Sequence, residues 1–167
     1  VVMSTACYPL FNQNTLLMAL DFDKYAQEGN EFMNHLAREL GHPEETGKTS
    51  IILRAVLHTL RDRLTVGESI NLLAQLPMML KAVYVEDWKY SEKPVKLKSI
   101  EQLKEHVKEE QEKYGETQFN WEEPTRDIIA TVLRVLSERY LSDGELRDIM
   151  AQLPDQMESV VREHING

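Results

Sequence analysis

The sequence carries one tetrapeptide twice, as Ala74-Gln75-Leu76-Pro77 and again as Ala151-Gln152-Leu153-Pro154. Before each copy stands a second shared pattern, Thr65-Val66-Gly67-Glu68 in the first and Ser142-Asp143-Gly144-Glu145 in the second. In both, a hydroxyl residue precedes a glutamate by three positions, which is the arrangement of a capping box at the start of a helix. The matched patterns indicate an internal duplication with a helix start at the same point of each copy.

An amphipathic helix is predicted just before the capping box in each copy. Its apolar residues follow helical spacing, and the copies align once a single inserted residue, Leu141, is allowed for in the second. The aligned residues are Ile52, Leu53, Val56, Leu57, Leu60 and Leu64 in the first copy and Ile128, Ile129, Val132, Leu133, Leu136 and Tyr140 in the second. A weaker match further upstream pairs Phe32, His35 and Leu36 with Leu103, His106 and Val107.

Each copy is expected to contain four helices. The first helix runs from about Asp23 to Leu40 and stops at Gly41, and its counterpart begins after the cap residue Ser99. Pro77 and Pro154 fit the first turn of the last helix in each copy, where a missing N–H costs nothing. Strand patterns are nearly absent. We therefore predict an all-α protein in which two tandem four-helix repeats pack into one pseudo-twofold helical body.

The composition is that of one folded domain of 167 residues, with 42% hydrophobic and 28% charged residues. Residues 1–20 carry no charged side chain, whereas later segments carry several. We therefore expect a non-core N-terminal extension over residues 1–20, a first helical repeat over 21–90 and a second over 91–167, with the repeats packed as one domain. Met18 is the expected natural start, so that residues 1–17 lie before it.

The charge balance and the single cysteine bear on the cellular compartment of the protein and on the classes of partner that it can bind. Nineteen Lys and Arg residues against 28 Asp and Glu residues leave a formal net charge of −9, which repels nucleic-acid phosphates and anionic lipid. The apolar run at residues 16–20 is too short for a membrane span. Cys7 has no second cysteine to pair with, as is usual in a reducing compartment. We expect a cytoplasmic protein that binds neither nucleic acid nor membrane.

The histidines do not form a familiar metal-binding pattern. None belongs to an H-x-x-x-H or H-E-x-x-H motif, and the paired Glu-x-x-His motifs of metal-binding helical bundles are not present in both copies. On a helical wheel His58 lies about 160° from the centre of the apolar stripe of its helix, so we expect it to face water. We predict no metal site and no cofactor.

His35 and His106 occupy equivalent places in the two copies, as do Arg63 and Arg139 just before the two capping-box patterns. One hypothesis makes these four residues a ligand-binding set in the cleft between the repeats, with the guanidinium groups directed at an anionic ligand. The alternative makes each arginine a cap of its own helix end and each histidine a structural side chain. We favour the alternative and keep the four residues as candidates.

Four large side chains are candidate anchors for a protein partner. Trp88 and Trp121 each lie in a linker beside a helix, and Met78 with Met79 follows Pro77. Tryptophan often anchors protein interfaces, and methionine provides an adaptable apolar surface. The same side chains fit an internal role as well, in which they seal or fill the core. Both roles stay open.

Several short motifs occur in a characteristic order. They are Arg54-Ala55-Val56-Leu57, Leu60-Arg61-Asp62-Arg63-Leu64, Gly67-Glu68, Leu73-Ala74-Gln75-Leu76-Pro77 and Lys81-Ala82-Val83-Tyr84, followed by Trp88. In this order and spacing the chain resembles the bacterial family called domain of unknown function 2267, over residues 21–165. The resemblance implies a compact helical fold in a bacterial cytosolic protein, and it implies no reaction.

Two functions remain as hypotheses. The first is a non-catalytic protein-interaction module that presents a groove or apolar patch to a protein partner or to a second copy of itself. It is motivated by the lack of a converging set of catalytic residues in the sequence. The second is a small-ligand binding protein or enzyme that uses the cleft between the two repeats, with an unknown ligand.

Overall fold

The computed structural model describes residues 20–89, 91, 93–115 and 121–167. This part of the chain consists of α-helices and loops without a strand, and none of its helices has the length and apolar character of a membrane span. The helices are α2 (Phe22–Glu39), α3 (Thr46–Arg63), α4 (Val66–Gln75), α5 (Met78–Val85), α6 (Ile100–Lys113), α7 (Thr125–Arg139), α8 (Asp143–Gln152) and α9 (Asp155–Asn166). The all-α prediction is confirmed. Apart from Leu20, the expected N-terminal extension, with Cys7 and Met18, lies outside the described residues.

The first of the two predicted capping boxes is confirmed at the start of α4. The Thr65 hydroxyl oxygen accepts a hydrogen bond from the Glu68 N–H at 3.3 Å, and the Glu68 carboxylate accepts one from the Thr65 N–H at 2.8 Å. At the start of α8, Ser142 accepts from the Glu145 N–H at 3.2 Å, but its own N–H donates to the Gln75 side-chain oxygen at 2.8 Å. The second capping box is therefore confirmed for the Ser142 side chain and wrong for Glu145. The side chain of Gln75 on α4 accepts the hydrogen bond from the Ser142 N–H that was expected to go to Glu145.

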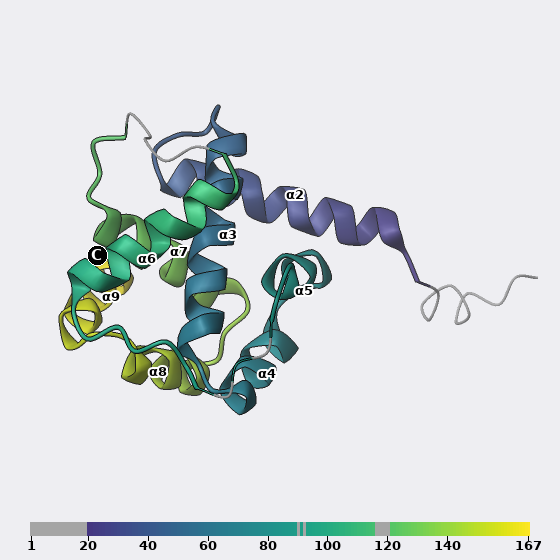
Figure 1. The fold of residues 1–167 in the computed structure, drawn as a ribbon. Coiled ribbons are helices and arrows are strands. Elements are labelled where there is room, and N and C mark those ends of the chain that lie inside the picture. The colour runs from purple at the N-terminus through teal and green to yellow at the C-terminus, as the bar shows by residue number, and fades with distance from the viewer. Residues whose placement is uncertain (1–19, 90, 92, 116–120) are drawn as a thin grey trace, which may run out of the picture.

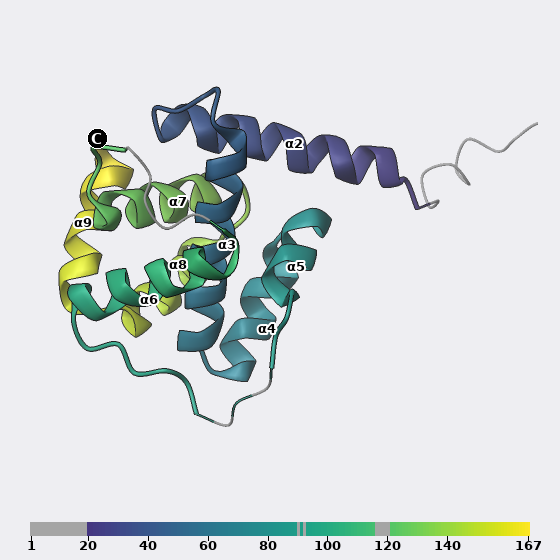
Figure 2. The same cartoon turned by 45° about the horizontal axis from the view of Figure 1, so that its top comes forward.

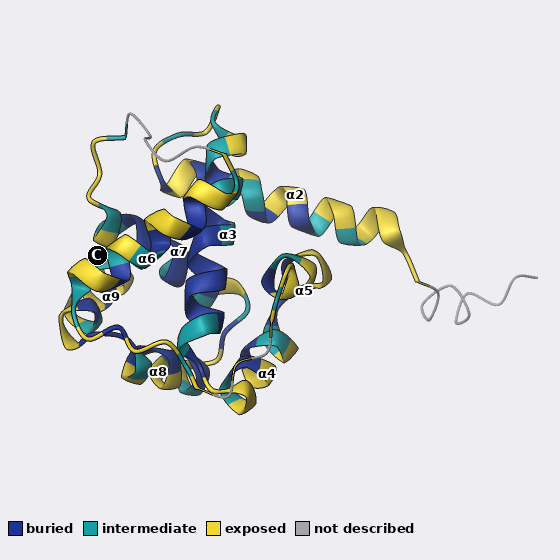
Figure 3. Ribbon diagram, viewed as in Figure 1, coloured by how far each residue is buried: buried dark blue, intermediate teal, exposed yellow. Residues whose placement is uncertain are grey.

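Helix α3 is the central element of the body (Figure 1, Figure 2). It contacts α2, α5, α6 and α7, and most of its length carries the colour of buried residues in Figure 3. His58 is consequently only 1% exposed, and the prediction that it faces water is wrong. The helical-wheel argument assumes one buried face, whereas α3 has neighbours on several sides.

The helices α2–α5 and α6–α9 share one hydrophobic core. Helix α6 packs along α3, and α2 packs on α7, so the first helix of each set lies on the second helix of the other. Phe32 on α2 meets Tyr140 at the end of α7, with ring centroids 5.6 Å apart. Helices α4 and α8 also lie against each other at one end of the body (Figure 1). Each set therefore buries part of its apolar surface against the other.

The N-terminal turns of α2 extend beyond the other helices (Figure 1). The Asp21 side chain caps this end by accepting a hydrogen bond from the Lys24 N–H at 3.0 Å. Leu20 and Phe22 stand at the same end, 71% and 74% exposed. Two large apolar side chains therefore face solvent where α2 leaves the body.

Phe32 and Phe22 lie on the same helix and test how strongly α2 depends on the contact with α7. Phe32 is fully buried, so Phe32→Ala is expected to lower the free energy of unfolding by about 3–5 kcal/mol. Phe22→Ala removes an exposed ring and should change it by less than about 0.5 kcal/mol. Urea denaturation followed by circular dichroism measures both, and equal effects of the two substitutions would contradict this packing.

Candidate functional site

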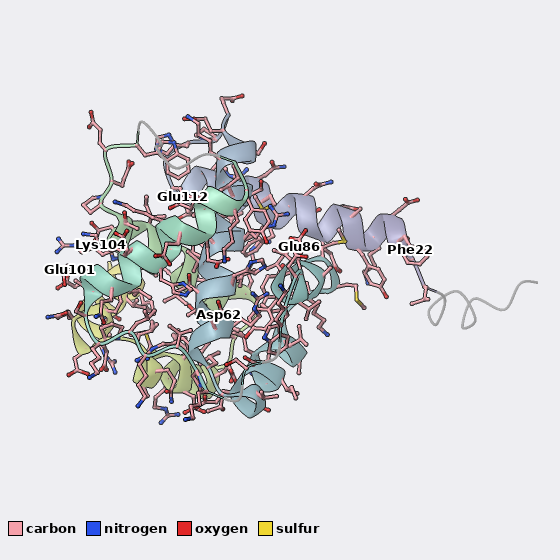
Figure 4. All side chains as sticks on the ribbon, in the orientation of Figure 1. Phe22, Asp62, Glu86, Glu101, Lys104 and Glu112 are labelled. Atoms are coloured by element: carbon pink, nitrogen blue, oxygen red, sulfur yellow. The ribbon has the colours of Figure 1, made fainter. Side chains whose placement is uncertain are left out.

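His58 and Asp62 lie four residues apart on α3, and His106 and Glu110 lie four residues apart on α6. Residues at this spacing share a helix face, and α6 packs along α3. Figure 4 shows Asp62 on α3 in the middle of the molecule, close to α6. The four residues form one group between the two helices, which we call the α3–α6 polar cluster.

His58 is held in one tautomer by its contacts. Its Nε2–H donates to the carbonyl oxygen of Val83 on α5 at 2.8 Å, which leaves a lone pair on Nδ1 of the neutral ring. Nδ1 lies 3.4 Å from Glu110 Oε2 and 3.4 Å from the Tyr114 hydroxyl. Burial lowers the pKa of His58 below its usual value of 6.5, although the bond to Val83 acts in the opposite direction. The imidazole is therefore neutral at pH 7, with Nδ1 directed at Glu110.

His106 connects the two helices from the other side of the cluster. Its Nδ1 lies 3.3 Å from the hydroxyl oxygen of Thr59, and its Nε2 lies 3.9 Å from Asp62 Oδ2. In the tautomer with the proton on Nδ1, the ring donates to Thr59, and the Nε2 lone pair faces Asp62. Both histidines thus direct one ring nitrogen at a carboxylate.

Each carboxylate of the cluster also has a cation beside it. Lys113 forms an ion pair with Glu110, and Arg61 Nε donates to Asp62 Oδ1 at 3.2 Å. Glu110 is 3% exposed. Its burial acts to raise the pKa, but the hydrogen bond and the charge of Lys113 outweigh burial and hold the pKa below 4.5. Glu110 is therefore an ionised carboxylate in a buried position at neutral pH.

The geometry of the cluster suits a cation. One ligand atom from each of Asp62, His106 and Glu110 lies within 4.8 Å of the other two. Carboxylate oxygens and imidazole nitrogens are common ligands of divalent transition metals. The same groups can also pass a proton between imidazole and carboxylate. The cluster is thus the place among the described residues where three possible metal ligands from two helices lie this close together.

Hydrogen bonds from Arg61 join the end of α5 to α3 next to the cluster. Arg61 Nη1 donates to the backbone carbonyls of Tyr84 at 3.0 Å and Glu86 at 2.9 Å. Tyr84 is fully buried, and its hydroxyl donates to Ser69 Oγ at 3.0 Å. Burial raises the pKa of Tyr84 to about 12, against the smaller effect of the bond to Ser69. These bonds fix the end of α5 and the segment that carries Trp88.

An open cavity of about 430 Å³ adjoins the cluster and includes Asp62 and Lys113 in its wall. Trp88, one of the predicted partner anchors, lines the same cavity. Its ring lies edge-on to Tyr84, with centroids 6.1 Å apart, and 5.9 Å from the guanidinium carbon of Arg61. Trp88 therefore packs on the end of α5 while part of its surface faces the cavity.

A second polar contact joins α2 to α7. His35 Nε2 lies 3.7 Å from Glu138 Oε2. Arg134 Nη2 donates to Glu39 Oε2 at 2.5 Å, and its Nη1 donates to Glu138 Oε1 at 2.6 Å. Burial acts to lower the pKa of Arg134, but its bonds to Glu39 and Glu138 outweigh burial and raise the pKa above its usual value. The guanidinium group thus carries a permanent positive charge between two carboxylates.

The four predicted ligand residues lie in different surroundings. Arg63 Nε donates to the Gln152 carbonyl at 2.5 Å, and its Nη1 donates to the Val95 carbonyl at 2.9 Å, so it ties α3 to α8 and to the linker. Arg139 is exposed at the end of α7. In the described part of the chain, no hydrogen bond or ion pair joins any two of Arg63, Arg139, His35 and His106.

The remaining predicted anchors differ in exposure. Trp121 packs against the core, stacks on His42 with centroids 4.1 Å apart and donates from Nε1 to Glu45 Oε1 at 3.3 Å. It thereby joins the loop after α2 to the segment before α7. Met78 and Met79, at the start of α5, are 46% and 43% exposed. The two methionines therefore present apolar surface to solvent, as a partner anchor must.

An apolar groove of about 220 Å³ lies between α2, α3 and α5. Its wall includes Ala26, Gly29 and Met33 of α2 and Met79 of α5. A Cβ atom at Gly29 would lie only 3.1 Å from Met79, so glycine at this position lets the two helices approach closely. We call this surface, together with Phe22 on the same face of α2, the α2 groove.

A search for the common sequence patterns of metal sites misses three residues of the polar cluster, which are His58, Asp62 and Glu110. Those patterns are His-x-x-x-His and Glu-x-x-His. The spacing His-x-x-x-Asp in α3 and His-x-x-x-Glu in α6 is the signal that finds them. It gains meaning only when the two helices are known to pack together.

Comparison with known proteins gives one family. A family model described as Uncharacterized conserved protein (DUF2267) matches residues 29–160. The matched range contains every residue of the polar cluster and most of the α2 groove. A search of the curated proteins finds no match.

The raised pKa of Tyr84 predicts a loss of stability in alkali. The phenol ionises near pH 10 in the unfolded chain and near pH 12 in the folded protein, so the unfolded chain loses its proton first. Stability from this group is complete below pH 10 and is lost as the pH rises towards 12. In Tyr84→Phe the urea midpoint should fall less steeply over this range than in the unsubstituted protein. Parallel slopes would contradict the buried phenol.

Proposed function

The chain belongs to the family described as Uncharacterized conserved protein (DUF2267), and because that description assigns no activity we propose a function from the geometry of the site. We propose that the protein is a non-catalytic interaction module that binds a helical segment of a partner protein in the α2 groove.

The observation that carries the proposal is a continuous apolar stripe on α2 that runs out of the body. Phe22, Ala26, Gly29 and Met33 follow one another at spacings of three and four residues, so they share one face of the helix. Phe22 is 74% exposed at the outer end, and Met33 is packed against the core at the inner end. An exposed apolar stripe that leads into a groove is typical of a binding surface for an amphipathic helix.

The opposite wall of the groove has the chemistry that such a partner needs. Met79 lines the groove and is 43% exposed, and the neighbouring Met78 is 46% exposed. Methionine side chains are flexible and polarisable, so they adapt to the apolar anchors of a bound helix. The ion pair of Lys24 with Glu28 and the hydrogen bond between Gln27 and Glu31 lie elsewhere on α2 and leave this face apolar.

The test is photo-cross-linking in cells with a photoreactive phenylalanine analogue. Placed at position 22 or 79, the analogue should give one defined cross-linked species, whereas at the exposed control position 156 on α9 it should give none. Adding Met78→Glu to the position-22 protein should abolish the species, because it places a charge beside the groove without disturbing the core. Equal cross-linking at all three positions, or none at 22 and 79, would contradict the proposal. A species of twice the chain mass would make a second copy the partner.

One observation favours the alternative, a small-ligand binding protein that uses the boundary between the two helix sets. Arg63, Lys96 and Lys98 line an open cavity of about 520 Å³, whose wall also includes Ala151, Leu153, Pro154, Asp155 and Gln156. Three cations in one wall would suit a small anion. Of the four predicted ligand residues, Arg63 belongs to this cavity. A small anion retained through purification would support this function.

We also propose that the two helix sets are tandem repeats related by a pseudo-twofold axis, with one repeat over residues 21–90 and the other over 91–167. Three pairs of reciprocal contacts support this arrangement. Gln75 Nε2 donates to Glu145 at 3.1 Å, and Gln152 Nε2 donates to Glu68 at 3.0 Å, so the glutamine of each Ala-Gln-Leu-Pro motif meets the glutamate of the other helix start.

The other two pairs follow from the alignment of the copies. It places Glu138 opposite Asp62, and the contact of His35 with Glu138 corresponds to that of His106 with Asp62. It also places Arg134 at the position of His58, and Glu39 at that of Glu110. Arg134 contacts Glu39 in one set of contacts, and His58 contacts Glu110 in the other. A bacterial origin and a cytoplasmic location remain predictions from the sequence.

The reciprocal glutamine contacts predict a matched pair of effects. Gln75→Ala removes the bonds to Ser142 and Glu145 and should lower the free energy of unfolding by about 1–2 kcal/mol, and Gln152→Ala should lower it by about 0.5–1.5 kcal/mol. The exposed Gln156→Ala is the control and should be close to neutral. Thermal denaturation measures all three. If both motif variants behaved like Gln156→Ala, the proposed interface between the repeats would be refuted.

A further inference from the structure

We propose that Asp62, His106 and Glu110 form a binding site for a divalent transition-metal ion, with Zn²⁺ as the best fit, between α3 and α6. This inference is independent of the α2 groove. It departs from the sequence-based expectation of no metal site, because that expectation did not consider two helices that each supply a histidine and a carboxylate.

The distances are close to those that an ion requires. Ligand atoms around a tetrahedral Zn²⁺ ion stand about 3.4 Å apart when the bonds are about 2.0–2.2 Å long. The three candidate ligand atoms lie within 4.8 Å of one another, and His106 Nε2 is 3.9 Å from Asp62 Oδ2. A shift of about 1 Å in the side chains closes the difference. Asp62 and His106 are partly exposed and have room for such a shift.

The groups around the three candidate ligands make hydrogen bonds of the kind that orient metal ligands. A metal-binding histidine commonly donates its second ring N–H to a protein oxygen, which fixes the tautomer. His106 has Thr59 Oγ1 at 3.3 Å from Nδ1, which leaves Nε2 for the ion. His58 donates from Nε2 to the Val83 carbonyl, and its Nδ1 lies 3.4 Å from Glu110 Oε2. The neutral His58 ring therefore lies beside the Glu110 carboxylate without donating a hydrogen bond to it.

The corresponding contact between α2 and α7 has a cation that bridges the two helices. There Arg134 sits between Glu39 and Glu138 and supplies a permanent positive charge. At the α3–α6 cluster the aligned position holds His58, and Lys113 and Arg61 approach Glu110 and Asp62 separately. An ion bound by Asp62, His106 and Glu110 would bridge α3 and α6 as Arg134 bridges the other pair of helices.

The site is open to solvent and has one built-in competitor. Asp62 and Lys113 belong to the wall of the cavity of about 430 Å³, which gives an ion a path to the cluster. Lys113 pairs with Glu110 through an exposed side chain, so an ion can displace its ammonium group. One nitrogen and two oxygen ligands favour zinc, cobalt or manganese over Mg²⁺ and Ca²⁺, which prefer oxygen alone.

Isothermal titration calorimetry on the full chain tests the site, with ZnCl₂ and CoCl₂ as probes. Chelator-treated Cys7→Ser protein is the reference, because a thiolate outside the described residues would otherwise compete for zinc. We expect one equivalent to bind, and the Co²⁺ complex to absorb in the visible range. Asp62→Asn and Glu110→Gln should each weaken binding at least about tenfold. His35→Asn, the matched control at the aligned histidine, should leave binding unchanged.

Lys113→Met separates loss of the site from loss of the fold. Its side chain is 61% exposed, and removing its charge should strengthen zinc binding several-fold without unfolding the protein. Failure of the reference protein to bind Zn²⁺ or Co²⁺ would overturn the proposal. Binding that Asp62→Asn leaves unchanged, while circular dichroism shows both proteins folded, would overturn it as well.

Discussion

The structure depends on the packing of α6 along α3, because this contact joins the two helix sets through both apolar and charged side chains. Leu103 and Val107 of α6 are buried in the shared core. On the same helix, Glu110 brings an ionised carboxylate into a buried position, where the ammonium group of Lys113 compensates its charge. Glu110 and the core residues Leu103 and Val107 lie on one helix, so the cluster and this part of the core depend on the same helix contact. Because helices cover α3 on several sides, His58 is buried as well.

The contact of α2 with α7 repeats this arrangement with one difference. Arg134 pairs with two carboxylates there with a charge that does not depend on pH, whereas the aligned His58 is neutral and Glu110 pairs with Lys113 instead. If the two sets are repeats, as we propose, one contact holds an arginine ion pair at this place and the other holds the proposed cation site. The α2 groove adjoins the cluster through Val83, which lines the groove and accepts a hydrogen bond from His58, but the three proposed metal ligands do not line the groove.

Local physical signals made much of the fold predictable. Thr65 and Ser142 mark helix starts because a hydroxyl group satisfies a free N–H, and Gly41 marks an end because it adopts a φ of 79°. The candidate site could be predicted less completely from the sequence. A sequence cannot show that α3 is surrounded by other helices, and for this reason the prediction that His58 faces water is wrong. The spacing of His106 and Glu110 indicates a site only once α6 is known to pack beside His58 and Asp62 on α3. Arg63 lies between the two sets, where it donates to the backbone carbonyls of Gln152 and Val95 and not to the end of its own helix.

The most direct test of this account is the zinc stoichiometry of Arg134→His, measured by native mass spectrometry on chelator-treated protein reloaded with zinc. The substitution gives the α2–α7 contact two histidines and two carboxylates, as in the α3–α6 cluster, with His35, Glu39 and Glu138 already in place and Glu138 standing where the cluster has Asp62. The account predicts two zinc ions per chain instead of one. A chain that still binds a single ion, or none, would contradict the claim that the two contacts are equivalent and that His58 in place of arginine opens one of them to a metal.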